Sequence, residues 1–273
     1  MDFPPSQVCP RRPLTPEVKR EAEPYAHKLA IRGLYDESLR LKNSEKYIAN
    51  CPSPLGEGYI SNCPSFYKRL NSHDVSSLSL SARVEYCRLL KTHTCGLHGE
   101  IAFNIYRGLN YHNNAFEVAN SYIYHNTEDT ETGEVWYPYI YPDACLDASC
   151  SVLNYCSGSV KIDVKCQSHR ACNEELGLDV LNYRSGRRIL YVAVSEHSEH
   201  NVSYDENGKT FYRVIDYAIL GYAFECELDK VAPTKKGWSH IHFYKLHPID
   251  CLTPSDYETS ETVYDRMKKL GCV

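Results

Sequence analysis

The stretch that decides the fold runs from residue 188 to residue 227 and reads RILYVAVSEHSEHNVSYDENGKTFYRVIDYAILGYAFECE. Its opening residues, Arg188–Val194, are apolar and rich in β-branched side chains, which predicts a strand. The turn residues Asp205–Gly208 follow, and their Asn-Gly pair tolerates the positive φ angles of a tight hairpin. The apolar and aromatic run Thr210–Glu227 then predicts two more strands, separated by a break at Gly221. This stretch therefore favours antiparallel sheet.

Strand signals also precede and follow this stretch. The apolar residues at positions 160, 162, 164 and 166 alternate with charged ones, which is typical of a half-exposed strand. The same criteria predict strands at residues 101–106, 121–125, 135–141, 151–156 and 241–246, and a short helix near residues 173–181.

The N-terminal part has helical spacing instead. Thr15-Pro16 is a typical helix start, and the breakers Pro24 and Gly33 predict two short helices after it. A serine cap predicts another helix from residue 79 to residue 90. We therefore expect an α+β fold in which N-terminal helices pack on a mainly antiparallel, twisted sheet that carries a Cys-rich hairpin insertion. The expected organisation is a flexible arm at residues 1–14 and a single domain at residues 15–273, mainly helical at 15–92, mainly strands at 97–250, with a C-terminal helix at 259–270.

Composition narrows the class of protein. The chain has 273 residues, 24% charged residues and a net charge of −5, which are ordinary globular values without a clear nucleic-acid patch. No apolar run approaches the roughly 18 residues of a membrane span. The opening MDFPPSQVCPRRP lacks the apolar core of a secretory signal. We therefore expect an intracellular protein, cytoplasmic or nuclear, whose thiols are mostly reduced.

The 13 cysteines suggest a metal site. Cys166, His169 and Cys172 lie close enough in sequence to reach one zinc ion, and Cys150 can supply a fourth ligand. A second, less regular cluster lies between Cys87 and His98. Buried thiols, or disulfides in an exported form, are the alternatives that the spacing leaves open.

Two segments resemble poly(ADP-ribose) polymerase-like ADP-ribosyltransferases. Residues 186–204, GRRILYVAVSEHSEHNVSY, are similar to the family's glycine, apolar strand and Ser-rich helix that ends in a tyrosine. Leu97-His98-Gly99 resembles its histidine–glycine strand. The resemblance implies that His98 hydrogen-bonds a ribose hydroxyl of NAD, that Gly99 admits the nicotinamide carboxamide and that Tyr191 stacks on the nicotinamide ring. Tyr204, the closing tyrosine, belongs to the same implied NAD site.

Arginine-specific transferases provide two further candidates by resemblance. They hold NAD phosphates with an arginine on a strand, which Arg107 resembles, and Glu225-Cys226-Glu227 has the spacing of their Glu-x-Glu pair, with Glu227 in the catalytic position. The acidic position of the polymer-forming enzymes falls near Ser239-His240, where no carboxylate is present. The resemblance therefore implies transfer of a single ADP-ribose from NAD to a macromolecular acceptor.

Two other functions stay open. One is a non-enzymatic, Cys-rich and zinc-stabilised domain that binds a protein partner. The other is a hydrolase or nuclease that uses His, Tyr and Lys side chains such as His169, Tyr155 and Lys161. A cleft in which His98 and Tyr191 face each other would favour the transferase. Placement of the two side chains on opposite sides of a sheet would argue against it.

Overall fold

The computed structural model describes residues 10–42, 75–76, 78–124, 143–146, 152, 160–167, 175–179, 189–204, 210–228, 235–236, 241–247, 265 and 267–269. Contacts divide the chain into two compact units. Unit 1 comprises Met1–Thr15, His98–Ala115 and Pro142–Val273, and unit 2 comprises Pro16–Leu97 and Phe116–Tyr141. The helices are α1 (Pro16–Lys42), α3 (Leu80–Tyr106), the π-helix η1 (His112–Phe116), α4 (Glu117–Tyr124) and α5 (Glu225–Leu228). The strands are β1 (Arg11–Arg12), β2 (Ala144–Cys145), β3 (Lys161–Gln167), β4 (Glu175–Asp179), β5 (Ile189–Tyr204), β6 (Thr210–Phe224), β7 (Lys235–Lys236) and β8 (Ile241–Lys245).

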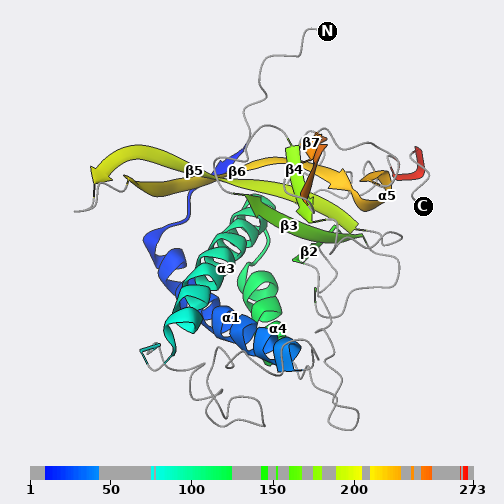
Figure 1. Ribbon diagram of the computed structural model, residues 1–273. Helices are drawn as coiled ribbons and strands as arrows, with labels where there is room; N and C mark the ends of the chain where they lie inside the picture. Colours follow the sequence, from blue (N-terminus) through cyan, green and yellow to red (C-terminus); the bar gives the residue numbers. More distant parts are fainter. Residues whose placement is uncertain are drawn as a thin grey trace. The chain divides into compact units, whose positions relative to one another are not determined.

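The main sheet of unit 1 has the strand order β1-β6-β5-β3-β2. Its neighbouring strands are antiparallel, with the exception of β3 and β5, which run parallel. A smaller antiparallel sheet has the order β4-β8-β7. Figure 1 shows β5 and β6 as the two long, curved strands of the main sheet. Helices combined with a mainly antiparallel sheet confirm the predicted α+β class.

The centre of β5 is buried on both faces. Leu190, Val192 and Val194 point to one side, Tyr191 and Ala193 point to the other, and all five are buried. A strand covered on both faces reads as a continuous apolar run instead of an alternating one. The run at the start of β5 is therefore the part of the sequence that places this strand inside unit 1.

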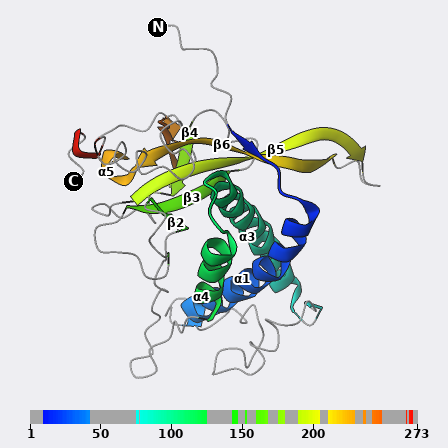
Figure 2. The ribbon, with the colours of Figure 1, turned by 180° about the vertical axis from the view of Figure 1, so that it is seen from behind.

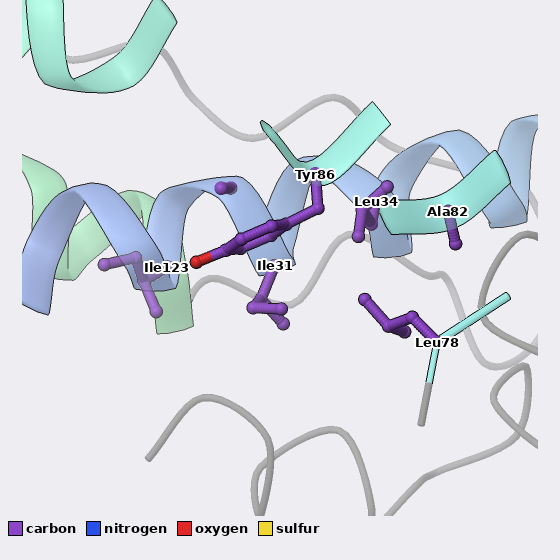
Figure 3. Close-up of a cluster of buried hydrophobic side chains, with 7 residues drawn as sticks. Ile31, Leu34, Leu78, Ala82, Tyr86 and Ile123 are labelled. Atoms are coloured by element: carbon purple, nitrogen blue, oxygen red, sulfur yellow. The ribbon is translucent and has the colours of Figure 1, made fainter. Parts of the chain in front are cut away.

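Unit 2 has its own apolar core, which Figure 3 shows in close-up. The core consists of Ala30, Ile31 and Leu34 from α1, Leu78 from the segment before α3, Ala82 and Tyr86 from α3, and Ile123 from α4. Ser79 caps α3, because its Oγ accepts a hydrogen bond from the amide of Ala82 at 3.3 Å. The predicted serine cap is confirmed.

Several predicted elements differ in the structure. The two short helices expected after Thr15-Pro16 are one helix, α1, with Pro24 inside it. Proline in a helix interior costs about 3 kcal/mol. The neighbouring Ala22, Ala26, Ala30 and Ile31 are almost completely buried, and tertiary packing of this kind supplies most of the stability of a helix in a protein.

The predicted strands at residues 101–106 and 121–125 are wrong. The first belongs to α3 and the second overlaps α4. Ile101, Ala102 and Phe103 are all fully buried, so α3 is covered on several sides there and its helical period is lost. The boundary between mainly helical and mainly extended chain therefore lies after residue 124 among the described residues, not at residue 97.

Three smaller corrections concern strands. The helix expected near residues 173–181 is strand β4, because it pairs with β8 along its whole length. The two strands expected in Thr210–Glu227 are the single strand β6, whose register shifts beside Gly221 before α5 begins. Part of the predicted flexible arm is strand β1, which pairs with β6. Of the predicted Cys-rich insertion, the structure describes Cys145 on β2 and Cys166 on β3, and the rest of its cysteines lie outside the described residues. Most of the predicted C-terminal helix lies outside them as well.

Candidate functional site

His98 and Gly99 lie in helix α3, not on a strand. His98 is buried, and its Nδ1 lies 2.7 Å from the hydroxyl of Tyr217 on β6. The two rings meet edge to face, with centroids 5.8 Å apart. One nitrogen of the candidate ribose-binding imidazole therefore already contacts a buried phenol of the same unit.

Gly99 marks a close contact between α3 and β3. A Cβ atom at this position would lie 2.6 Å from the Cβ of Cys166 and 2.9 Å from its Sγ. Real side chains do not approach so closely, so glycine is needed here for helix–strand packing. This contact explains the glycine without a bound nicotinamide.

Tyr191 lies on the face of the sheet opposite to His98. In the register of the sheet, Tyr217 pairs with Glu196 and Cys166 pairs with Val194. Glu196 and Val194 lie five and three residues after Tyr191, and both separations are odd numbers. The side chains of β5 alternate from one face to the other over this range. Because side chains alternate along a strand, both registers place Tyr191 on the other face. The structure therefore does not bring His98 and Tyr191 together.

The side chain of Tyr191 fills the second core of unit 1. It is 6% exposed and packs in a cluster with Ala193, Ala223, Leu228, Tyr244 and Leu246. The ammonium group of Lys165 lies 5.8 Å from the centre of its ring, within the range of a cation–π contact. In this position Tyr191 packs against core side chains over most of its surface.

The buried side chain of Arg107 hydrogen-bonds to the backbone. Its side chain is 4% exposed. One terminal nitrogen donates to the carbonyl of Cys145 at 3.0 Å, and the other donates to the carbonyl of Leu146 at 2.9 Å. Arg107 follows the last residue of α3 directly and is not on a strand. Its fork-shaped donors join the end of α3 to strand β2 instead of facing an open phosphate site.

Glu227 forms a pair that the sequence did not predict. Both of its carboxylate oxygens lie 2.9 Å from Nε2 of His247. One of them also accepts the amide of Phe224 at 3.2 Å, which joins α5 to the end of β6. His247 is held in place by two backbone hydrogen bonds with Tyr222. Glu227 and His247 are twenty positions apart in the sequence and share no local motif, so only the folded chain reveals the pair.

A close backbone approach makes this pairing possible. A Cβ atom on Gly221 would lie 2.3 Å from the carbonyl oxygen of His247 and 2.9 Å from the Cβ of Leu246. Glycine at the register shift of β6 therefore lets the chain at His247 pair with β6. The break that the sequence predicts at Gly221 is a packing feature within one strand.

The remaining predicted site residues are only partly described. Tyr204 ends β5 opposite Thr210. In the resembled family a helix follows the first strand, whereas β5 continues as a strand through Tyr204. Cys150, His169 and Cys172 lie outside the described residues, so the zinc site stays a prediction. Cys166 carries a thiol and packs against Gly99.

The cysteines that the structure describes are in two states. Cys87, Cys95, Cys145 and Cys166 carry thiols. Cys145 is buried, Cys95 and Cys166 are half-buried, and Cys87 is exposed. Cys226 in α5 is disulfide-bonded. No group of three or more His, Cys, Asp or Glu side chains within the described ranges could hold a metal ion. The cluster between Cys87 and His98 is spread along helix α3, which separates its ends by about 16 Å of helix rise.

Helix α3 carries an exposed stripe in unit 2. We use this name for Leu80, Val84 and Cys87, which lie at helical positions i, i+4 and i+7 and therefore on one face. Leu80 is 72% exposed and Val84 is 65% exposed. Cys87 is exposed as well.

The chain matches no protein-family model, and it has no significant match among curated proteins or solved structures. Within the part of the chain that the structure describes, no helix combines the length and apolar character that crossing a membrane requires.

Proposed function

We propose that this chain is a protein-interaction domain that binds an amphipathic helix of a partner protein through the exposed stripe of α3. The observation that carries the proposal is the pair Leu80 and Val84, two large apolar side chains one helical turn apart and mostly exposed to solvent. Burial of such a side chain stabilises a complex by about 1.5–3 kcal/mol. Anchors at i, i+4 and i+7 are the pattern by which two helices recognise each other.

Charge favours an acidic partner. The part of α3 from Leu80 to Lys91 contains three basic residues, Arg83, Arg88 and Lys91, and one carboxylate, Glu85. Arg88 and Glu85 form a bidentate pair with distances of 2.5–3.0 Å. Arg83 and Lys91 therefore supply the net positive charge beside the stripe. Complementary carboxylates on the partner helix would speed association and exclude basic competitors.

The ADP-ribosyl transfer implied by the resemblance stays a prediction that the geometry does not favour. A nicotinamide ring cannot lie between His98 and Tyr191 when a sheet separates them. A hydrolase or nuclease built on His169, Tyr155 and Lys161 also stays a prediction, because the first two residues lie outside the described residues.

Two peptides of opposite charge test the proposal. One is an amphipathic helix of about 18 residues with leucines at i, i+3, i+4 and i+7 flanked by glutamates, and the other replaces every glutamate with lysine. Fluorescence anisotropy would measure the binding of each peptide to the full chain and to the double variant Leu80→Gln/Val84→Gln. The control variant is Ser81→Gln, which changes an exposed residue beside the stripe on the same helix.

We expect the acidic peptide to bind the natural chain and the control at least about tenfold more tightly than it binds the double variant, a difference of about 1.4 kcal/mol. The basic peptide should bind about tenfold more weakly than the acidic one. Equal binding to the double variant would overturn the proposal. A dimer of the natural chain in sedimentation, abolished in the double variant, would replace the partner helix with a second copy and also contradict it.

A further inference from the structure

Strand β5 extends beyond the strand that pairs with its outer edge. Its pairing with β3 ends where Gln167 meets Ser195, whereas its pairing with β6 continues to Tyr204. Figure 2 shows the far end of β5 and the start of β6 running out together beyond β3. Among the strands that the structure describes, none pairs with this edge of β5 from residue 196 to residue 204. The edge therefore offers backbone amides and carbonyls to a further strand.

The first part of this edge has the regular backbone of a strand. Residues 196–199 of β5 pair in order with β6. The register shift after His197 places the additional residue, Ile215, on β6, so β5 itself is not interrupted there. The next shift comes after Glu199, and β5 continues through it to Tyr204. Residues 196–200 therefore provide five successive positions of one strand along the open edge.

The sequence of these five residues is complementary to itself when two copies run antiparallel. Residues 196–200 read Glu-His-Ser-Glu-His, and we call them the self-complementary segment. A two-fold axis at Ser198 places Glu196 opposite His200 of the second copy, and it places His197 opposite Glu199. Because the two copies are identical, each of these pairings occurs twice. An acidic residue therefore meets a histidine in all four pairs, and opposite charges at such positions stabilise paired strands.

The charges also select this alignment over its neighbours. If the second copy moved by one position in one direction, Glu196 would lie opposite Glu199. A movement by one position in the other direction would place His197 opposite His200. Like charges directly opposite each other destabilise paired strands, so both neighbouring alignments are disfavoured. The segment therefore specifies one antiparallel alignment with a copy of itself.

We propose that this chain forms a homodimer in which the self-complementary segments of two copies pair antiparallel at the outer edge of β5. The pairing joins the main sheets of the two copies into one sheet and covers an edge to which other extended chains could add. The contact is isologous, because the same residues serve on both sides. The segment belongs to unit 1, so the dimer contact is separate from the exposed stripe of α3 in unit 2.

Protonation of the histidines should strengthen the dimer. A histidine is charged mainly below its ordinary pKa of about 6.5, and glutamate is ionised above about pH 5. Within one copy, His197 pairs with Asp216 on β6 and Glu199 pairs with Arg213. Arg11 on β1 also forms an ion pair with Asp216. These neighbours are present in the monomer and in the dimer, so the four Glu–His pairs are the charge contacts that dimerisation adds.

Two charge-swap variants test the pairing. In the acidic variant, His197→Glu/His200→Glu, acidic residues lie opposite acidic residues in all four pairs. In the basic variant, Glu196→Lys/Glu199→Lys, basic residues lie opposite basic residues. An equimolar mixture of the two variants restores opposite charges in every pair. Sedimentation equilibrium of the full chain at about pH 6 would measure the association of each variant and of the mixture.

The control variant is Glu21→Lys/Glu23→Lys, which makes the same two substitutions at exposed positions of α1 in unit 2. We expect the natural chain and the control to dimerise equally at about 100 µM, because a short contact binds weakly. Each charge-swap variant alone should dimerise at least about tenfold more weakly, and the mixture should recover the association of the natural chain to within about threefold. The natural dimer should weaken at least about fivefold between about pH 6 and about pH 8.

Three results would overturn the dimer. They are a natural chain that stays monomeric at about 100 µM, a dimer that persists in both charge-swap variants, and a mixture that stays monomeric. If either variant does not fold, the natural chain decides, because association that does not change with pH would exclude the Glu–His pairs. A dimer that is lost in Leu80→Gln/Val84→Gln and kept in both charge-swap variants would place the contact on the exposed stripe instead.

Discussion

His98 and Tyr191 lie on opposite faces of one β-sheet. His98 reaches Tyr217 from helix α3, and Tyr191 packs into the core on the other side. The separation removes the shared pocket that an NAD site would need. It also predicts that NAD⁺ does not stabilise the protein. A site occupied at a hundred times its dissociation constant would add about 2.7 kcal/mol to the free energy of unfolding. A stabilisation of that size by NAD⁺, measured by thermal unfolding, would contradict this arrangement and support the transferase prediction.

The two buried His–Tyr pairs should be similar in strength. His98 meets Tyr217 at 2.7 Å in unit 1, and His27 meets Tyr86 at 2.8 Å in unit 2. Either Tyr→Phe substitution leaves a buried imidazole nitrogen without that hydroxyl, so each should lower the free energy of unfolding by about 1–3 kcal/mol. Urea unfolding would measure both losses. A loss below about 0.5 kcal/mol in either variant would show that the hydrogen bond contributes little.

Gly99→Ala should destabilise unit 1. The added methyl group would meet the Cβ of Cys166 at 2.6 Å, so helix and strand must separate, which costs about 1–3 kcal/mol. Gly33→Ala in α1 is the matched control. Its nearest neighbour is the Cδ1 of Leu89 at 3.2 Å, at the end of a flexible side chain, and alanine favours a helix. Thermal unfolding should therefore show a loss for Gly99→Ala and little change for Gly33→Ala. Equal losses would contradict the close contact.

Unit 2 should lose stability in acid because of His93. Burial, followed by the nearby charge of Arg88, lowers the pKa of His93 from 6.5 to about 4. Between pH 6.5 and about pH 4 the imidazole of His93 is therefore protonated in the unfolded chain and neutral in the folded chain. The free energy of unfolding falls as the pH drops through this range. We expect a loss of about 1–2 kcal/mol between pH 7 and pH 5 after allowance for screening. His93→Gln should remove that part of the slope in urea titrations, whereas an unchanged slope would assign it to other groups.

Glu227 should act on stability through His247. Both oxygens of Glu227 contact the His247 ring, whose side chain is 36% exposed, and one accepts a backbone amide. Glu227→Ala should therefore lower the free energy of unfolding by only about 1 kcal/mol, because the contact between the two side chains is partly exposed to solvent. The double-mutant cycle with His247→Ala isolates the pair. A coupling energy near zero would mean that Glu227 acts through the amide of Phe224 alone.

The predictions from sequence succeeded for elements whose structure depends mainly on neighbouring residues. Strand β3 and strand β8 lie within a residue or two of their predicted ranges, and Ser79 caps α3 as expected. They failed at residues 101–106, where α3 is buried on several sides and its amphipathic period disappears. They also failed at β4, because its pairing with β8 is a contact between residues far apart in sequence.

The candidate site was harder to predict than the fold. The sequence identified Gly99, Arg107 and Glu227 as unusual, and the structure gives each a packing or hydrogen-bonding reason. It gave no sign of the pair that Glu227 forms with His247. Such groups form from side chains on separate elements, so no spacing along the chain reveals them.

The sequence by itself determined that apolar and β-branched segments form strands, that a serine-capped segment forms a helix and that the two combine in an α+β fold. These outcomes follow from side-chain sterics and from the burial of apolar surface, which act over a few neighbouring residues. Only the tertiary structure decided on which face of the sheet Tyr191 lies and which phenol His98 meets. Strand register decides the face of every side chain, and register depends on hydrogen bonds between segments that the chain order does not place side by side.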